Sequence, residues 1–127
     1  MNSIRKTAVK ILFLEDNDLY RESLSELLET LGYEVLALPD GFAFMQCLEK
    51  FKPNLILMDL HFPPLDGFKL MKKWQKSIHK DVPIFILSAS ELPEDRDKAI
   101  ALGASRFLPK STTVREIERA IKEELKS

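Results

Sequence analysis

The chain has 127 residues, a length that fits one domain built around one hydrophobic core. Its 19 Lys and Arg and 20 Asp and Glu residues give a formal net charge of −1, which excludes bulk attraction to nucleic acid or to anionic membranes. The single cysteine, Cys47, cannot form an internal disulfide, and no apolar run approaches the ~20 residues of a membrane span. We therefore expect a cytoplasmic protein.

Five apolar runs along the chain predict β-strands. Leu55–Met58 and Ile84–Leu87 are unbroken apolar runs, and Val9–Leu14 is mostly apolar. Continuous apolarity is typical of strands that are buried on both faces, as in a parallel sheet. Tyr33–Leu38 and Arg106–Leu108 carry the same signal more weakly.

Between these strands, apolar residues recur at helical spacing, and Phe42 is assigned to the buried face of the second helix. Gly32 ends the first helix, and Pro93 opens a short helix that ends near Gly103. The series of five strand–helix pairs predicts a doubly wound α/β fold with a parallel sheet and right-handed crossovers. The helical stripes are Leu24, Leu27, Leu28 and Leu31; Phe44, Cys47, Leu48 and Phe51; Met71, Trp74 and Ile78; and Val114, Ile117, Ile121 and Leu125.

Polar residues follow four of the five predicted strands. Glu15 and Asp16 come after the first strand, and Asp59 after the third. Ser88 follows the fourth strand and Lys110 the fifth. Because ligands of open parallel sheets bind outside the carboxyl ends of the strands, we expect these side chains to form one site.

The three acids of this group predict a metal site. Glu15, Asp16 and Asp59 would repel one another unless a cation lay between them, and carboxylates suit a hard ion such as Mg²⁺. Acids after a strand can also cap the next helix. We assign Asp18 to capping and Asp16 to the metal, because Asp59 arrives from a different strand.

Asp59 itself is a candidate nucleophile. It ends an apolar strand, and carboxylates can form acyl phosphates. Mg²⁺ and the ammonium of Lys110 would neutralise charge on a transferring phosphoryl group, and Ser88 would supply a hydroxyl donor. Taken singly, Lys110 could be a solvated lysine and Ser88 a turn residue. Their convergence on one edge favours the functional interpretation.

Four segments together resemble the receiver domains of two-component response regulators: ILFLEDND, LILMDLHFPPLDGFKLM, IFILSAS and GASRFLPKS. The resemblance covers nearly the whole chain, and several separated motifs in order make it specific. It implies a flavodoxin-like sheet with the strand order 2-1-3-4-5. It also implies that Asp59 accepts a phosphoryl group from a phosphohistidine of a histidine kinase or histidine phosphotransfer protein.

The resemblance implies a role for each acid. Asp16 and Asp59 resemble direct Mg²⁺ ligands, and the backbone carbonyl of His61 resembles a third. Glu15 resembles the outer acid that holds a metal-bound water. Mg²⁺ is thus the implied cofactor.

The remaining residues of the pattern resemble a switch. Ser88 resembles the hydroxyl that turns toward the phosphoryl group, and Phe107 the aromatic residue that moves inward with it. Lys110 resembles the lysine that binds a phosphoryl oxygen. Pro63 and Gly67 match the loop after the phosphoacceptor.

The chain departs from the family pattern around the lysine and after Asp59. Proline usually follows the lysine through a cis peptide, whereas Ser111 stands there in this chain. A cis bond to serine would cost roughly 3–4 kcal/mol. Phe62 replaces a common methionine. His61 and Ser90 occupy places that face the approaching water or donor in this family, where they tune the phosphoryl lifetime.

We therefore predict a single receiver domain over residues 1–127, with a core of about residues 8–126 and no output domain visible. It would assist its own phosphorylation and dephosphorylation without turning over a separate substrate. The resemblance implies a downstream protein target at the face formed by the fourth helix, fifth strand and fifth helix, with no direct contact to nucleic acid or membrane.

Three other functions can be compared with the same residues. Asp16–Asp18 resembles the DxD nucleophile of haloacid-dehalogenase-like phosphatases, with Asp16 as nucleophile, but Leu19 follows where Thr or Val is usual. A nucleotide- or flavin-binding module would need a glycine-rich first loop, and this loop offers carboxylates instead. A pseudo-receiver that works without phosphorylation stays open because of Ser111.

Overall fold

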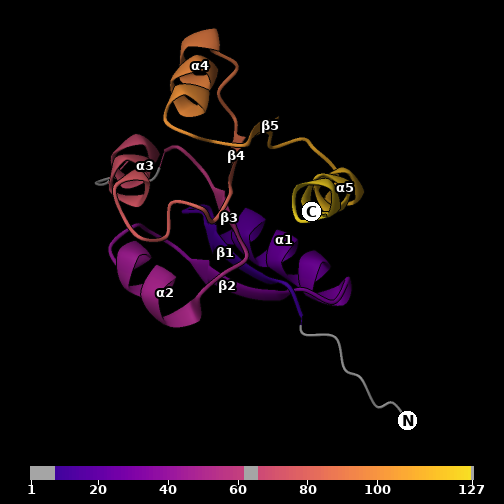
Figure 1. The fold of residues 1–127 in the computed structure, drawn as a ribbon. Helices are drawn as coiled ribbons and strands as arrows, with labels where there is room; N and C mark the ends of the chain where they lie inside the picture. The colour runs from indigo at the N-terminus through magenta and orange to yellow at the C-terminus, as the bar shows by residue number, and fades with distance from the viewer. Residues whose placement is uncertain (1–7, 62–65, 127) are drawn as a thin grey trace.

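The computed structural model describes residues 8–61 and 66–126, and in them five strands alternate with five helices (Figure 1). The strands form one parallel sheet in the order β2-β1-β3-β4-β5. This order confirms the doubly wound α/β fold and its flavodoxin-like topology. The strands are β1 Lys10–Leu14, β2 Glu34–Leu38, β3 Leu55–Met58, β4 Ile84–Ser88 and β5 Arg106–Pro109.

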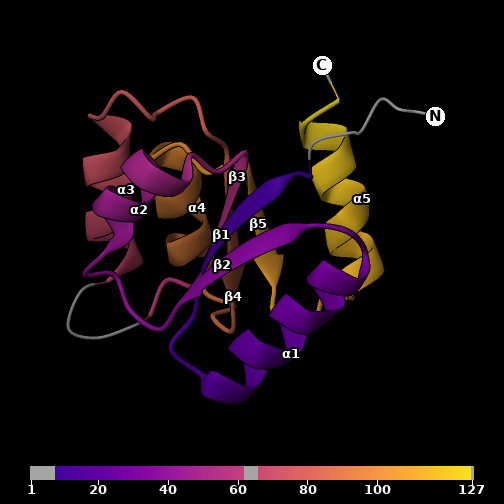
Figure 2. The same ribbon diagram turned by 90° about the horizontal axis from the view of Figure 1, so that it is seen from below.

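The helices cover both faces of the sheet, with α1 and α5 on one side and α2, α3 and α4 on the other (Figure 2). This arrangement buries both faces of the central strands, and every residue of β3 and β4 is buried. Among the described residues, no helix combines the length and apolarity needed to cross a bilayer. The helices are α1 Asp18–Thr30, α2 Phe44–Phe51, α3 Gly67–Gln75, α4 Pro93–Ala101 and α5 Val114–Glu124.

Alternate residues of β1 serve the two halves of the core. Leu12 and Leu14 pack in the cluster that includes α2 and α3, whereas Ile11 and Phe13 pack in the cluster with α1 and α5. All four side chains are fully buried. Because each buried side chain of this size contributes about 1.5–3 kcal/mol, the continuous apolar runs of the sequence provide the main stabilisation of the sheet.

Residues typical of helix caps stand at both ends of α1. Asn17, and not Asp18 as predicted, caps α1: its side chain accepts a hydrogen bond from the amide of Tyr20. Asp18 lies in the first turn and accepts a bond of 2.7 Å from Arg21. Gly32 follows α1 with a φ of 100°, a conformation that favours glycine, which agrees with its predicted role as a stop.

Three predicted core positions are wrong. Ile78 is 86% exposed because α3 ends at Gln75, where the amide and hydroxyl of Ser77 both bond the carbonyl of Trp74. Phe42 is 69% exposed and precedes α2, since its amide bonds the side chain of Asp40 in a turn.

The third is Leu27, which is 50% exposed, whereas Leu24 and Leu28 of the same helix are buried. The contact between α1 and the sheet is therefore narrower than the apolar stripe of the sequence. Cys47 is partly buried against the core, and Trp74 is buried in it.

We expect Leu57→Ala to lower the free energy of unfolding by about 2–5 kcal/mol, because it opens a cavity in fully buried β3. Ile78→Ala is the matched control and should change it by less than about 0.5 kcal/mol, since its side chain is already in water. Urea denaturation followed by circular dichroism measures both. Equal losses in the two variants would contradict this description of the core.

Candidate functional site

The sheet brings four strand ends to the same level. The ladder continues past the strands, because the amide of Glu15 bonds Leu38 and the amide of Asp59 bonds Leu14, each at 3.0 Å. The amide of Lys110 bonds the carbonyl of Ser88 at 3.1 Å. The polar residues that follow β1, β3 and β5 are therefore held by backbone hydrogen bonds and not only by their side chains.

Three carboxylates lie together at this edge. Glu15, Asp16 and Asp59 each offer an oxygen within 4.8 Å of the others. Glu15 is fully buried and Asp59 is 4% exposed, whereas Asp16 faces solvent. An all-oxygen donor set with one open side suits Mg²⁺, which keeps several of its waters. These residues thus fit the ion that the sequence implied.

Lys110 lies between the two buried acids. Its Nζ is 2.8 Å from Oε1 of Glu15 and 3.1 Å from Oδ2 of Asp59. Burial raises the pKa of Glu15, although the bond from Lys110 opposes this shift. Burial alone would lower the pKa of Lys110, but its contacts with the two acids outweigh it and raise that pKa. The lysine is therefore held as a cation.

Lys110 reaches this position with Ser111, and not proline, after it. Its carbonyl accepts a bond of 3.3 Å from the hydroxyl of Tyr20, and its Nζ lies 5.0 Å from the centre of the Tyr20 ring. The turn that follows is closed by the amide of Thr112, which bonds the carbonyl of Pro109 at 3.0 Å. These contacts anchor the lysine without a proline.

The loop after Asp59 is closed by a glycine. The amide of His61 donates to Oδ1 of Asp59 at 3.3 Å, and the amide of Gly67 bonds the carbonyl of Leu60 at 2.8 Å. A Cβ on Gly67 would lie 2.9 Å from the carbonyl oxygen of Asp59, so only glycine fits without a shift. Phe62 and Pro63 lie outside the described residues.

Ser88 and Phe107, the predicted switch pair, lie on the neighbouring strands β4 and β5. Ser88 is 1% exposed, and its Oγ accepts a bond of 3.0 Å from the amide of Ser90. Phe107 lies on the edge strand β5 and is partly buried against the cluster under α2, α3 and α4. In the register of the two strands, Phe107 pairs with Ile86 and Ser88 pairs with Pro109.

Sequence reasoning missed Tyr20, Arg21 and Asp95. Arg21 donates to the carbonyl of Glu15 at 2.9 Å, and Asp95 of α4 contacts two loops at the site. Tyr20 and Arg21 stand three and four residues after the cap Asn17, a spacing that turns the side chains of a first helical turn back toward the strand end. Asp95 had no comparable signal in the sequence.

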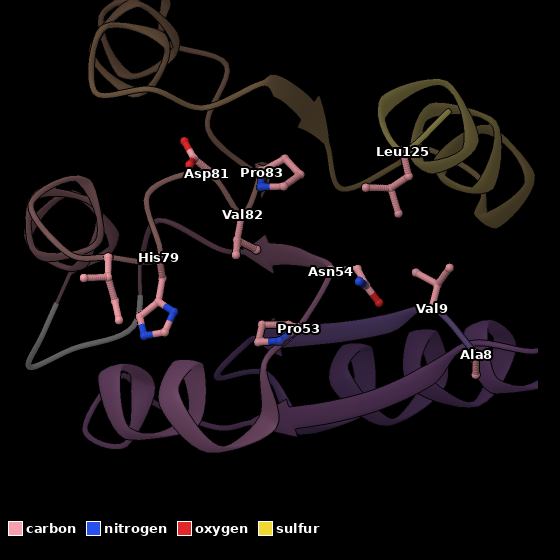
Figure 3. A pocket seen from close by; sticks show the side chains of 10 residues that line it. Ala8, Val9, Pro53, Asn54, His79, Asp81, Val82, Pro83 and Leu125 are labelled. Atoms are coloured by element: carbon pink, nitrogen blue, oxygen red, sulfur yellow. The ribbon is translucent and has the colours of Figure 1, made fainter. Parts of the chain in front are cut away.

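A separate pocket of about 600 Å³ opens at the amino ends of the strands, opposite the acidic cluster (Figure 3). Its lining includes Asn54 and Pro83, which directly precede β3 and β4, and Leu125, which follows α5. None of the carboxylates of the acidic cluster lines it. The pocket is therefore separate from the acidic cluster, which lies at the carboxyl ends of the strands.

We expect Asp16→Asn to remove most of the stabilisation by Mg²⁺, since it takes away one of the three carboxylates. In the wild type, Mg²⁺ at a hundredfold excess over its Kd should add roughly 2.7 kcal/mol to the free energy of unfolding. Urea denaturation in Mg²⁺ and in EDTA measures this difference. Asp97→Asn, at an exposed acid of α4, is the control and should respond like the wild type. A full response in Asp16→Asn would contradict the assignment.

The chain is similar to known proteins along most of its length. It is 33% identical over 122 residues to the probable transcriptional regulator ycf27 of Galdieria sulphuraria, covering 96% of this chain and 47% of that protein. The chain spans about half the length of the curated relatives it matches.

Two solved structures share the fold closely. Chemotaxis protein CheY4 of Vibrio cholerae is 27% identical with a TM-score of 0.86, covering 94% of this chain and all 100% of its own. The receiver domain of sensor histidine kinase PA1611 from Pseudomonas aeruginosa, solved with a magnesium ion coordinated in its active site cleft, is 29% identical with a TM-score of 0.87, covering 95% and 100%. A family model, the response regulator receiver domain, matches residues 11–122. The chain therefore belongs to the response regulator receiver domain family.

Proposed function

We propose that Asp59 is the phosphoacceptor of this receiver domain, that its phosphorylation requires Mg²⁺, and that the modification switches a protein-interaction surface. The observation that carries the proposal is the meeting of three carboxylates and one ammonium at a single sheet edge. Of the three acids, Lys110 contacts only Glu15 and Asp59, so with Asp16 beside them the cluster carries an excess of negative charge that is unfavourable without a bound cation.

The acids would bind the metal in two ways, directly and through a water. Asp16 and Asp59 would hold Mg²⁺ directly, together with the carbonyl of His61, and Glu15 would hold it through a water. When bound, Mg²⁺ would neutralise charge on the phosphoryl oxygens. The receiver domain of PA1611 was solved with magnesium in its cleft, which supports this proposal for the related site here.

The chain's own residues position the reacting groups. An oxygen of Asp59 would attack the phosphorus of a phosphohistidine while the bond from phosphorus to the histidine nitrogen breaks. The nearby Nζ of Lys110 would then bind a phosphoryl oxygen, and the hydroxyl of Ser88 would donate to another. The rigid backbone of Asp59, held by β1 and β3, keeps the carboxylate in place.

Receiver domains are phosphorylated by histidine kinases, and they are signalling modules rather than classical enzymes. We infer that the donor of this chain is a histidine kinase or a histidine phosphotransfer protein. The chain would assist its own phosphorylation and dephosphorylation without a separate substrate. It stays a prediction that residues 1–127 form a single receiver domain. The cytoplasmic location of the protein also stays a prediction.

The face of α4, β5 and α5 is the proposed contact for a downstream protein. It exposes the apolar side chains of Leu92 and Ile100, at 56% and 43%. Ser88 and Phe107 underlie this face, so a shift of the hydroxyl toward a phosphoryl group would bias its conformation. The net charge of −1 argues against direct contact with nucleic acid, although curated relatives are transcriptional regulators.

We expect incubation with acetyl phosphate and Mg²⁺ to add the mass of one phosphoryl group to the wild type. Asp59→Asn should show no gain, because the amide cannot form an acyl phosphate, and omission of Mg²⁺ should abolish it. Intact-protein mass spectrometry measures the gain.

Other outcomes would favour other functions. A gain that persists in Asp59→Asn and vanishes in Asp16→Asn would point to the haloacid-dehalogenase-like chemistry with Asp16 as nucleophile. No gain in any sample, with a histidine kinase also tried as donor, would favour a pseudo-receiver that binds its partner without phosphorylation.

A further inference from the structure

The phosphoacceptor is almost closed to solvent. Only 6% of the Asp59 side chain is exposed, yet the proposed function needs a phosphoryl group to arrive there and water to remove it. His61 follows β3 and Ser90 follows β4, and these two strands are neighbours in the sheet. The side chains of His61 and Ser90 therefore lie at the same edge as Asp59.

One carboxylate from α4 contacts both of these residues. Oδ2 of Asp95 accepts a bond of 2.6 Å from the hydroxyl of Ser90 and lies 3.8 Å from Nε2 of His61. The Asp95 side chain is only 21% exposed, so it faces these partners and not open solvent. Asp95 thus connects the loop after β3 with the loop after β4.

Ser90 connects Asp95 to the buried residue Ser88. Its amide donates to Oγ of Ser88 at 3.0 Å, and its own Oγ also accepts a bond of 3.2 Å from the amide of Leu92. The first turn of α4 is therefore tied to Ser88 through one serine. Leu92 is the N-cap of α4 but has no side-chain oxygen to cap it, so the contacts of Ser90 provide a polar anchor for that helix end.

We propose that Asp95 is a positioning residue that holds His61 and Ser90 together over the exposed side of Asp59 and so limits the access of water to the phosphorylated carboxylate. We call the contacts of Asp95 with Ser90 and His61 the mouth latch. This inference rests on the proposed function.

The step that the mouth latch slows is hydrolysis of the acyl phosphate. Water attacks phosphorus, and the bond from phosphorus to the Asp59 oxygen breaks with its electron pair returning to the carboxylate. The water contributes its oxygen to inorganic phosphate and releases its proton to the solvent. Because the attacking water must reach phosphorus from the open side of Asp59, residues bridged there obstruct its approach.

The test compares Asp95→Ala with Asp97→Ala, which removes the same charge from an exposed position of the same helix. Each protein is phosphorylated with acetyl phosphate and Mg²⁺, the donor is removed, and loss of the phosphoryl mass is followed over time. Asp95→Ala should lose the phosphoryl group roughly threefold to tenfold faster than the wild type. This is the change in rate expected when one hydrogen bond no longer stabilises the arrangement that obstructs water. Asp97→Ala should match the wild type.

Ser90→Ala breaks the mouth latch from its other end and guards against a folding defect in Asp95→Ala. It should also shorten the lifetime, and the double variant should be no faster than the faster single one, because both remove the same contact. Additive effects would overturn the proposal.

Amide hydrogen exchange provides a measurement that does not need phosphorylation. The Ser90 amide should exchange faster in Asp95→Ala than in Asp97→Ala. Faster exchange with an unchanged phosphoryl lifetime would mean that Asp95 only orders the first turn of α4, and unchanged exchange would mean that it does not hold Ser90; either result overturns the proposal. A wild type that gains no phosphoryl group would instead refute the proposed function, and the role in hydrolysis would fall with it.

Discussion

The ammonium of Lys110 between the buried carboxylates of Glu15 and Asp59 is the contact around which this end of the molecule is organised. Two acids in this position would be costly to bury without a cation, and one lysine compensates them only in part because Asp16 stands beside them. The excess negative charge leaves the cluster suited to a divalent ion. With Mg²⁺ bound, the cluster would also accept the negative charge of a phosphoryl group, so the need for a cation links the stability of the site to its proposed chemistry.

The parallel sheet makes this contact possible. Glu15 and Asp59 follow neighbouring strands whose backbone bonds continue into the site, and Lys110 is tied to Ser88 in the same way. Gly67 allows the next helix to approach the carbonyl of Asp59 more closely than any side chain would permit. The site is therefore positioned by backbone geometry, which a change in a distant surface residue cannot easily disturb.

The solvent-facing side of the site is held less firmly than its floor, the buried residues at the strand ends. Glu15, Asp59 and Ser88 are buried, whereas the side chain of His61 is 60% exposed and that of Asp95 is 21% exposed. Loops around a rigid floor can change the rate of access without changing the chemistry. This division suggests how receivers with the same acidic cluster could differ in signal duration: through the residues that bridge the loops, as proposed here for Asp95.

The sequence by itself determined the fold class, because unbroken apolar runs such as Leu55–Met58 alternate with helical patterns, as is typical of strands buried between two layers of helices. It also placed the acids, Ser88 and Lys110 at strand ends, since that order is a property of the chain. The apolar pattern did not determine where helices begin and end: Ile78 and Phe42 fit the pattern, yet both lie in turns closed by local hydrogen bonds. Asp95 gave no signal, because its contacts join residues from different loops that only the folded sheet brings together.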